Sequence, residues 1–469
     1  MAKLYERVAS QLASLVEGGV YSTGERVPSV RVLSKELEVS ATTVVEAYRL
    51  LEDQGVLEAR PQSGYYVRPR ALHDENSPRT ICPITSDPLP VTVGDMVVSL
   101  MKDSARADVV PLGGADPAAD LIPVKAIQKC VAAAVRDSDC LTEYDPPPGC
   151  RDLRLAISKR AALAGCHFTF NDIVLTNGAQ EAITLCLRAT CSVGDVVAIE
   201  SPTFFGQLQA IEMLGLRVLE IPSDPSTGIS LDALQLALEQ MPVKAVMATP
   251  SHSNPSGSLM PEENRRELVE MVTRAGVPLI EDDVYGDLGC AMTRIPAAKA
   301  FDRDGNVLYC SSFSKTLAPG YRIGWAVAGK YRDDVEKLKT LTNLASPAVL
   351  SLGISRYLQG SAYDRTLRMM RREYARRTRA MRDAILAQFP HGTRVSQPQG
   401  GYVLWVELPR RYNSLELYRQ ARALGIIFAP GPMFSAGKRY LHCLRLSAGD
   451  WGPREQHALE TLSRLLAQA

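Results

Sequence analysis

Apolar residues recur at two different spacings along the chain, and the spacing changes near residue 70. In residues 4–16 and 41–54 they return every three or four positions, as in amphipathic helices. From about residue 93 onward, short apolar runs alternate with amphipathic or turn-rich segments. This alternation predicts an α/β fold with a mostly parallel sheet. The predicted strands are 173–176, 196–200, 217–221, 245–249, 278–282 and 307–311.

The first 70 residues predict three helices followed by a hairpin. Ser29 and Ser40 stand immediately before the second and third helices, where a serine side chain can cap the free N–H groups. The runs 56–60 and 64–67 are short, apolar and separated by a turn. Two short helices in tandem with a hairpin predict a winged helix-turn-helix.

Residues 71–92 are rich in proline, serine and charge and show no periodicity, so they predict a linker. We therefore expect three parts: a winged helix at 1–70, the linker at 71–92, and the α/β part at 93–469. A smaller α+β subdomain is expected from about residue 345 to the end, with strands in GYVLWVEL and CLRLS. A chain of 469 residues is long enough for this organisation.

Composition limits the range of partners. The formal net charge is +1, and residues 1–70 carry nine basic and nine acidic residues, so affinity for non-specific DNA should be weak. Operator binding then calls for a dimer on two half-sites. The ten cysteines include no C-x-x-C pair, which indicates free thiols in the cytoplasm and no metal site. No apolar run is long enough to predict a membrane span.

Polar and aromatic side chains follow the predicted strands, at the edge where ligands bind in parallel sheets. Glycine opens a helix after the first strand, which suits a phosphate. Later strands are followed by an aromatic ring, an amide, a carboxylate with a phenol, and an amine. Each residue alone has a structural reading as a cap, a turn former or a core residue. Their occurrence in order at successive strand ends favours one site.

The N-terminal part resembles the GntR-type winged helix. The likeness rests on G-x-Y-x-x-G-x-x-x-P-S-x-R-x-L from residue 19 and on S-A-T-T-V-x-x-A-Y-x-x-L from residue 40. The resemblance implies binding to double-stranded operator DNA, with side chains that reach phosphates or base edges. A helical interaction domain without DNA is the alternative. The implied DNA-binding residues are Arg31, Ala41, Thr42, Thr43, Tyr48, Arg60, Ser63 and Gly64.

Residues from about 108 to 469 resemble a fold-type I aminotransferase dependent on pyridoxal 5'-phosphate, most clearly in S-x-S-K-x-x-x-P-G-x-R-x-G from residue 312. By this resemblance Lys315 would hold the cofactor covalently, and Asp282 would pair with its ring nitrogen. Together with Tyr285 they form the implied catalytic set. The other implied cofactor-binding residues are Asn254, Phe204, Gly178, Ala179, Gln180, Ser312, Arg322 and Tyr144.

The resemblance also implies a substrate or effector end of this site. Arg445, in C-L-R-L-S, resembles the arginine that binds an α-carboxylate, and Gly113 and Gly114 would line the same end. Tyr144 resembles a tyrosine that reaches the phosphate of the partner subunit. The resemblance therefore implies a homodimer.

The two parts together resemble the MocR/GabR-type regulators, which are bacterial and dimerise head to tail. The resemblance implies a cytoplasmic transcription regulator whose second part senses an amino compound or pyridoxal 5'-phosphate itself. Because no catalytic position is missing, a working aminotransferase with an appended DNA-binding domain remains open. A scaffold without cofactor is disfavoured by Lys315 together with Asp282.

Eight arginines fall between Asp364 and Asp383, in a segment that predicts a long helix. They could contact DNA phosphates and so offset the neutral winged helix. More often such a helix is a solvated face whose arginines pack along their stems. The sequence leaves both alternatives open.

Overall fold

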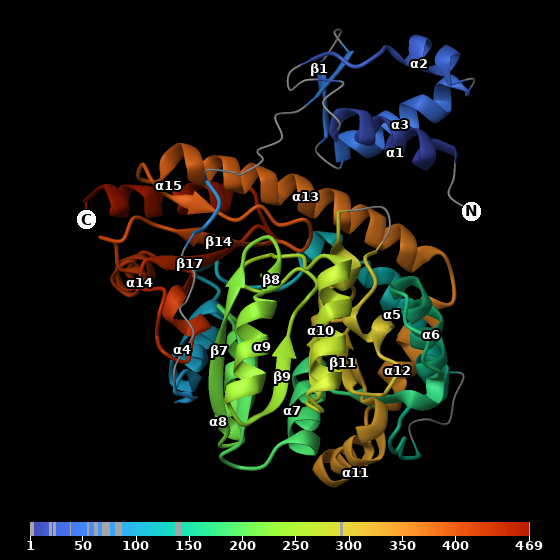
Figure 1. Ribbon diagram of the computed structural model, residues 1–469, viewed down its shortest axis with the longest axis vertical. Coiled ribbons are helices and arrows are strands. Elements are labelled where there is room, and N and C mark those ends of the chain that lie inside the picture. The colour runs from blue at the N-terminus through green and yellow to red at the C-terminus, as the bar shows by residue number, and fades with distance from the viewer. Residues whose placement is uncertain are drawn as a thin grey trace. The chain divides into compact units, whose positions relative to one another are not determined.

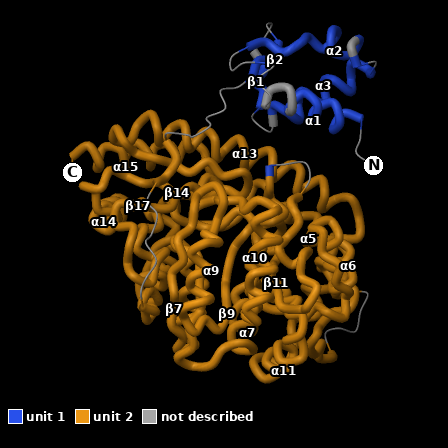
Figure 2. Tube along the Cα trace, viewed as in Figure 1, with its two compact units in different colours: residues 1–75, 290–293 blue, residues 76–289, 294–469 orange. Residues whose placement is uncertain are grey.

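The computed structural model describes residues 4–17, 21, 25–37, 39–53, 56–60, 64–67, 76–79, 87–136, 142–290 and 294–468. They belong to two compact units, residues 1–75 with 290–293 and residues 76–289 with 294–469 (Figure 2). Each unit is described by itself.

Unit 1 is the predicted winged helix-turn-helix. Its helices enclose a small apolar core that includes Val8, Leu12 and Val44. Ser29 Oγ accepts a hydrogen bond from Val32 N at 3.4 Å, so it caps the second helix as expected. The elements are α1 (Leu4–Glu17), α2 (Val30–Glu36), α3 (Ala41–Asp53) and an antiparallel hairpin of β1 (Leu57–Arg60) and β2 (Gly64–Val67).

Unit 2 is built on a nine-stranded sheet, and all six predicted strands are present in it. The strand order is β3-β7-β6-β9-β10-β11-β12-β5, with β8 paired to β7 (Figure 1). β7, β6, β9, β10 and β11 are parallel, while β3 and β12 run antiparallel to their neighbours. The strands are β3 (Leu89–Pro90), β5 (Ile173–Thr176), β6 (Val196–Ser201), β7 (Arg217–Asp224), β8 (Gly228–Ile229), β9 (Val243–Ala248), β10 (Leu279–Asp282), β11 (Val307–Ser312) and β12 (Gly324–Val327).

Helices cover both faces of this sheet. Val197 and Ile199 of β6 pack into one core with α4, α7 and α8, whereas Val196 and Ala198 pack into another with α9 and α10. A strand that is buried on both faces reads as a continuous apolar run, which is why these runs were visible in the sequence. The helices of this part are α4 (Gly94–Ser104), α5 (Val124–Arg136), α6 (Arg151–Ala161), α7 (Ala179–Thr190), α8 (Phe205–Met213), α9 (Leu231–Gln240), α10 (Glu262–Arg274), α11 (Arg332–Asn343) and α12 (Ala348–Leu358).

The C-terminal part of unit 2 has a sheet of its own. Its order is β13-β14-β17-β16, and it packs with three helices around a third apolar core. Strand β4 (Val110–Pro111), which lies far earlier in the sequence, pairs in parallel with β15 (Ile426–Ile427), so residues near 110 also belong to this part. The remaining elements are α13 (Ala362–Gln388), β13 (Arg394–Val395), β14 (Val403–Glu407), α14 (Ser414–Ala423), β16 (Ala429–Pro430), β17 (Cys443–Ser447) and α15 (Pro453–Gln468).

The end of the predicted linker is structured. Leu89–Pro90 forms β3 on the edge of the main sheet, and Val91 and Val93 are buried in its core. The alternation of apolar residues at positions 89, 91 and 93 is a strand signal that the prolines of this segment obscured. Unit 2 therefore includes residues that the sequence placed in the linker. Within the ranges described above, no helix combines the length and the apolar character that crossing a bilayer requires.

Candidate functional site

The predicted side chains meet at the C-terminal edge of the main sheet, where β5, β6, β9, β10 and β11 end. Parallel strands bring their carboxyl ends to one edge, so residues far apart in sequence become neighbours there. Arg445 reaches the same place from β17, because its guanidinium bonds Asn254 in the loop after β9.

Lys315 lies just beyond β11, in a partly buried position. Its Nζ donates a hydrogen bond to the Ala115 carbonyl at 2.7 Å, and it makes no ion pair among the described residues. Burial lowers the pKa of the Lys315 amine, although the nearby Asp116 carboxylate acts in the opposite direction. A lowered pKa leaves more of the amine neutral and nucleophilic near neutral pH.

Asp282 ends β10 and is buried. Its Oδ2 accepts a hydrogen bond from Gln207 Nε2 at 3.2 Å, and Gln207 Nε2 also donates to Thr249 Oγ1 at 3.0 Å. Burial raises the pKa of Asp282 to about 6. No cationic side chain in the described ranges forms an ion pair with this carboxylate. It is therefore suited to a cationic group of a ligand, which would hold it ionised.

Arg445 is only 1% exposed, yet no carboxylate among the described residues pairs with it. Its Nη1 donates to Asn254 Oδ1 at 2.9 Å and its Nη2 donates to the Gly113 carbonyl, while Nε has no partner in this part of the structure. Burial lowers the pKa of Arg445 to about 10. A buried guanidinium held by neutral acceptors is suited to a carboxylate from outside the chain.

Tyr285 is buried three residues after Asp282, and its hydroxyl has no hydrogen-bond partner among the described residues. The Tyr402 ring packs against it edge-on at 5.7 Å, but the Tyr402 hydroxyl donates to the Ala115 carbonyl. Burial raises the pKa of Tyr285, so its phenol stays protonated. An unpartnered buried hydroxyl is costly unless a ligand completes its bonding.

A group of N–H donors and one guanidinium lies at the start of α7. Gly178 precedes the helix with φ of +85°, and no side chain of the described residues caps the helix, so the first-turn N–H groups at Ala179 and Gln180 are available to a ligand. Arg322, itself left-handed with φ of +52°, donates from Nη2 to the Asn177 carbonyl at 3.2 Å. Ser312 lies at the end of β11, where its Oγ accepts from Ser314 N at 3.3 Å.

The remaining predicted residues lie around these groups. Phe204 precedes α8, and a Cβ on Gly206 would lie 2.4 Å from its ring and 2.7 Å from Gln180 Oε1, so the ring borders the start of α7. Gly113 approaches the backbone so closely that a Cβ would lie 2.5 Å from Ala429 N, whereas Gly114 has room for one. Tyr144 is 79% exposed.

The donor set fits pyridoxal 5'-phosphate on three independent observations. Gly178 leaves room beside the Arg322 guanidinium that a Cβ would fill. Among the described residues, the buried Tyr285 hydroxyl has no hydrogen-bond partner and the buried Asp282 carboxylate has no cationic partner. A phosphate, a phenolic oxygen and a pyridinium nitrogen complement these three in turn.

A Gly178→Ala variant tests the phosphate-binding end. A Cβ there would lie 2.4 Å from Arg322 Nη2, so the guanidinium would have to move. We expect the affinity for pyridoxal 5'-phosphate to fall by roughly tenfold or more, the effect of losing one charge-assisted hydrogen bond. Equilibrium dialysis measures it. Gly194→Ala is the matched control, because Gly194 has φ of +89° but no atom within 4 Å of its Cβ position. Equal losses in the two variants would assign the effect to backbone strain.

Glu200 of β6 is a buried carboxylate near the site, and the sequence analysis did not single it out. It accepts hydrogen bonds from Thr249 N and Ser253 Oγ, and burial raises its pKa from 4.5 to about 7. Stability contributed by the protonated form is therefore fully present below about pH 4.5 and is lost as the pH rises through about 7.

A Glu200→Gln variant cannot ionise at this position, so its free energy of unfolding should not fall for this reason as the pH rises. Relative to the native chain, its free energy of unfolding should rise by about 2 kcal/mol between roughly pH 5 and pH 8. Urea denaturation of both proteins at the two pH values measures the difference. A difference that stays constant with pH would contradict the raised pKa of Glu200.

In unit 1 the predicted DNA-binding residues divide into two groups. Arg31, Ala41 and Thr42 are exposed at the starts of α2 and α3, and Thr43 is half-buried, with its Oγ1 2.8 Å from Ser40 Oγ. Gly64 begins β2 with φ of +110°, where a Cβ would lie 3.1 Å from the Arg26 side chain. The Arg60 side chain and Ser63 lie outside the described residues.

The prediction for Tyr48 is wrong. It was predicted to contact DNA, but its side chain is fully buried in the core of unit 1 and its hydroxyl donates to the Pro28 carbonyl. Its position on α3, one turn after Val44, places it on the inner face of the helix. Tyr48 therefore fixes α3 against the turn before α2 and does not face DNA.

Sequence reasoning missed Gln207, which donates hydrogen bonds to Asp282 and to Thr249. It also missed Tyr402, which shares the Ala115 carbonyl with Lys315. A signal existed for Gln207. It lies inside the apolar stretch FGQL, where a polar residue would face the core. Buried polar groups need partners, and here the partner is the carboxylate of the site.

One family model matches within each of the two parts of the chain. Residues 4–67 match the model of bacterial regulatory proteins of the gntR family, and residues 107–455 match aminotransferase class I and II. The HTH-type transcriptional regulator YdcR of Escherichia coli is 37% identical over 468 residues, covering 99% of both chains. YjiR of the same organism, also named an HTH-type transcriptional regulator, is 36% identical and covers 94% of both.

Solved structures match the second unit. Kynurenine aminotransferase of Pyrococcus horikoshii superposes with a TM-score of 0.74 at 28% identity, over 80% of this chain and 94% of that one. LysN, the α-aminoadipate aminotransferase of Thermus thermophilus, gives 0.72 at 27% identity, over 81% and 99%. With a GntR-type winged helix ahead of an aminotransferase domain, and with full-length relatives of the same architecture, the chain belongs to the MocR/GabR-type regulators.

Proposed function

We propose that the protein is a transcription regulator that binds operator DNA through unit 1 and senses an amino acid through pyridoxal 5'-phosphate in unit 2. The observation that carries the proposal is Arg445, a buried guanidinium without a carboxylate partner among the described residues, in the same site as Lys315. An amine and a carboxylate on one ligand would satisfy this pair of positions. An α-amino acid has both groups.

The cofactor supplies an aldehyde and an electron-withdrawing ring. The chain's own residues do the rest. The Lys315 amine, whose pKa is lowered by burial, would be the nucleophile and would later carry a proton. Asp282 would hold a proton on the ring nitrogen, and Gln207 fixes the Asp282 carboxylate. Tyr285 and Asn254 would donate hydrogen bonds to the ring oxygen, Phe204 would stack on the ring, and Arg445 would orient the substrate carboxylate.

Amino acid binding can affect DNA binding only if the two arrangements of the protein differ in their affinity for the ligand. We propose that the arrangements are those of a head-to-tail homodimer, in which the exposed Tyr144 reaches the partner's phosphate site. Two winged helices then meet two operator half-sites. Such a regulator acts in the cytoplasm, where the DNA is.

The test of DNA binding starts from genomic fragments selected by the full-length protein, followed by fluorescence anisotropy on the recovered sequence. Arg31→Glu should weaken binding by about tenfold or more, because an exposed phosphate or base contact becomes a repulsion. Arg379→Glu, an exposed arginine of α13, is the matched control for charge. Failure to recover any sequence, or equal affinity of the two variants, would contradict the proposed role of α2.

A second candidate function is favoured by the completeness of the site. Lys315, Asp282 and Arg445, the residues that transamination would use, lie in one site. Incubation with an amino acid and a keto acid, with chromatographic detection of the new amino acid, tests this activity. Sustained turnover would make the protein an aminotransferase as well as a regulator. A single-turnover limit would leave it a sensor.

A further inference from the structure

The arginines of α13 are of two kinds. Arg371 Nε donates to the Asp287 carbonyl at 2.7 Å, and Arg377 bonds Asp120, Glu373 and the Gly449 carbonyl, so both are committed to the fold. A second set is exposed and makes no ion pair among the described residues. That set consists of Arg365, Arg368 and Arg372, which follow one another at spacings of three and four, and of Arg379 further along the helix.

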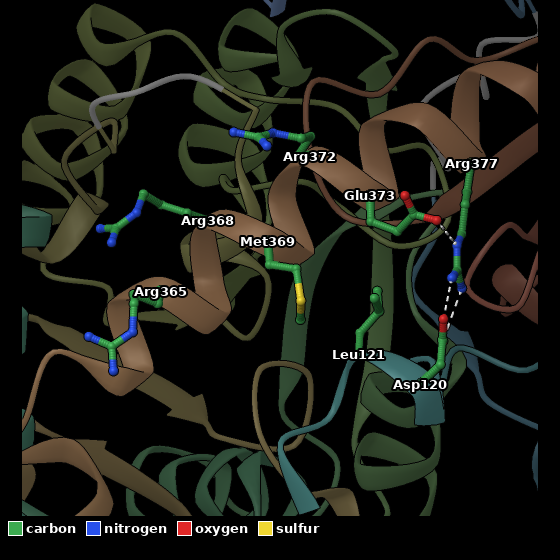
Figure 3. A pocket seen from close by; sticks show the side chains of 8 residues that line it. All are labelled: Asp120, Leu121, Arg365, Arg368, Met369, Arg372, Glu373 and Arg377. Carbon is green, nitrogen blue, oxygen red and sulfur yellow. Dashed lines mark hydrogen bonds and ion pairs between the residues drawn. The ribbon is translucent and has the colours of Figure 1, made fainter.

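Arg365, Arg368 and Arg372 line a pocket of about 410 Å³ together with residues of the short helix Ala119–Leu121 (Figure 3). Leu121 and Met369 supply apolar surface in its middle. Arg377 lies at one end, held between Glu373 and Asp120, while Arg365 and Arg368 lie toward the other. The volume is in the range of small-molecule sites.

The charge of the pocket is unbalanced. Its lining has four guanidinium groups and two carboxylates, for a net charge of +2, and both carboxylates are already bonded to Arg377. The uncompensated arginines stand at spacings of three and four along one helix face, where like charges repel. An anion in the pocket would remove this repulsion.

We propose that this pocket binds a small phosphate monoester with an apolar body. Near neutral pH a phosphate monoester has close to two negative charges, which match the net charge of the lining. The planar forks of Arg368 and Arg372 suit phosphate oxygens, and Leu121 with Met369 suits the organic part. DNA is the less suitable ligand, because a concave wall with an apolar centre does not follow a sugar–phosphate backbone.

The pocket shares a chain segment with the site described above. Gly113 and Ala115 accept hydrogen bonds from Arg445 and Lys315, and the same segment runs on to Asp120, which bonds Arg377. The two sites are nevertheless distinct, because their lining residues do not overlap.

The test is calorimetric titration of phenyl phosphate into the full-length protein that has been loaded with pyridoxal 5'-phosphate and freed of excess cofactor by gel filtration, so that the phosphate position at α7 is filled and the proposed pocket is not. We expect one site per chain, and a loss of affinity of at least about tenfold in Arg368→Gln with Arg372→Gln, since each removes charge-assisted hydrogen bonds. Both residues are exposed, so the fold should survive, as thermal unfolding would verify. Arg371 is left intact because of its bond to Asp287.

Arg379→Gln is the matched control, since Arg379 is an exposed arginine of the same helix outside the pocket. Full affinity in this control supports the assignment. Equal affinity in the native protein and the double variant would overturn it by placing the ligand elsewhere. Absence of phenyl phosphate binding to the native protein would also overturn it. In that case the affinity of the double variant for duplex DNA is measured, and a loss of that affinity would favour a DNA contact by these arginines instead.

Discussion

A Lys315→Ala variant is expected to lose the visible absorption band that pyridoxal 5'-phosphate gives with the native protein. The cofactor should then bind only non-covalently, because the covalent link to the amine is gone. The amount of cofactor that stays with the protein after gel filtration should fall by about a hundredfold or more. Lys315 has the features this role requires. It follows β11 at the ligand edge, its pKa is lowered by burial, and its Nζ is held by one carbonyl and no carboxylate in the described ranges.

Lys330→Ala is the control for this variant, because Lys330 is an exposed lysine of the same unit. It should keep the full band. Thermal unfolding of both variants shows whether the fold is retained. A band of native intensity in Lys315→Ala would mean that another amine reacts with the cofactor, and it would remove Lys315 from the site.

Arg445→Leu is expected to weaken the binding of an α-amino acid by about a hundredfold or more, which is the effect of removing one partner from a buried charge pair. The guanidinium is fixed by Asn254 and Gly113 before any ligand arrives, so little entropy is lost when a carboxylate binds. Titration of the cofactor spectrum with a panel of amino acids measures the affinity.

The ligand itself provides the control for Arg445→Leu. For the tightest-binding amino acid, the amine that lacks only the carboxylate should bind the native protein and the variant with similar affinity. If the variant loses the amine and the amino acid equally, the substitution has damaged the pocket. Arg445 would then have no specific role in carboxylate recognition.

Much of the fold follows from the sequence because burial leaves a plain pattern. The strands of the main sheet are covered on both faces, so each is a continuous apolar run, and the long α13 repeats its apolar residues over 27 positions. β3 was assigned to the linker because Leu89–Pro90 is a two-residue edge strand among prolines. Edge strands are short and tolerate proline, so they resemble loops in sequence.

The site was predictable at the strand ends and less so elsewhere. Asp282 is the last residue of β10 and Lys315 lies three residues beyond β11, so the topology of a parallel sheet places both. Gln207 lies inside a helix, and its contact with Asp282 depends on how α8 packs. The same limit explains Tyr48, since helical spacing shows that it shares a face with Val44 but does not say which face meets DNA.

The sequence also could not show which arginines of α13 are bonded to the fold and which are exposed. Arg371 and Arg372 are adjacent in sequence, but one is bonded to Asp287 and the other is exposed at a pocket. Charge counting treats them alike, because it carries no information on which side of a helix packs. A charge reversal of both would therefore mix a loss of folding contacts with a loss of surface charge.

The most direct test of the proposed regulator records two signals from the same samples. An amino acid that changes the cofactor spectrum is titrated into the full-length protein bound to its selected operator, while fluorescence anisotropy reports DNA binding. A sensor requires the two signals to change together, with midpoints that agree, and neither should respond to the amino acid in Lys315→Ala. A spectrum that saturates while the DNA affinity stays constant would contradict the proposed coupling, and would leave unit 2 as an aminotransferase joined to an independent DNA-binding domain.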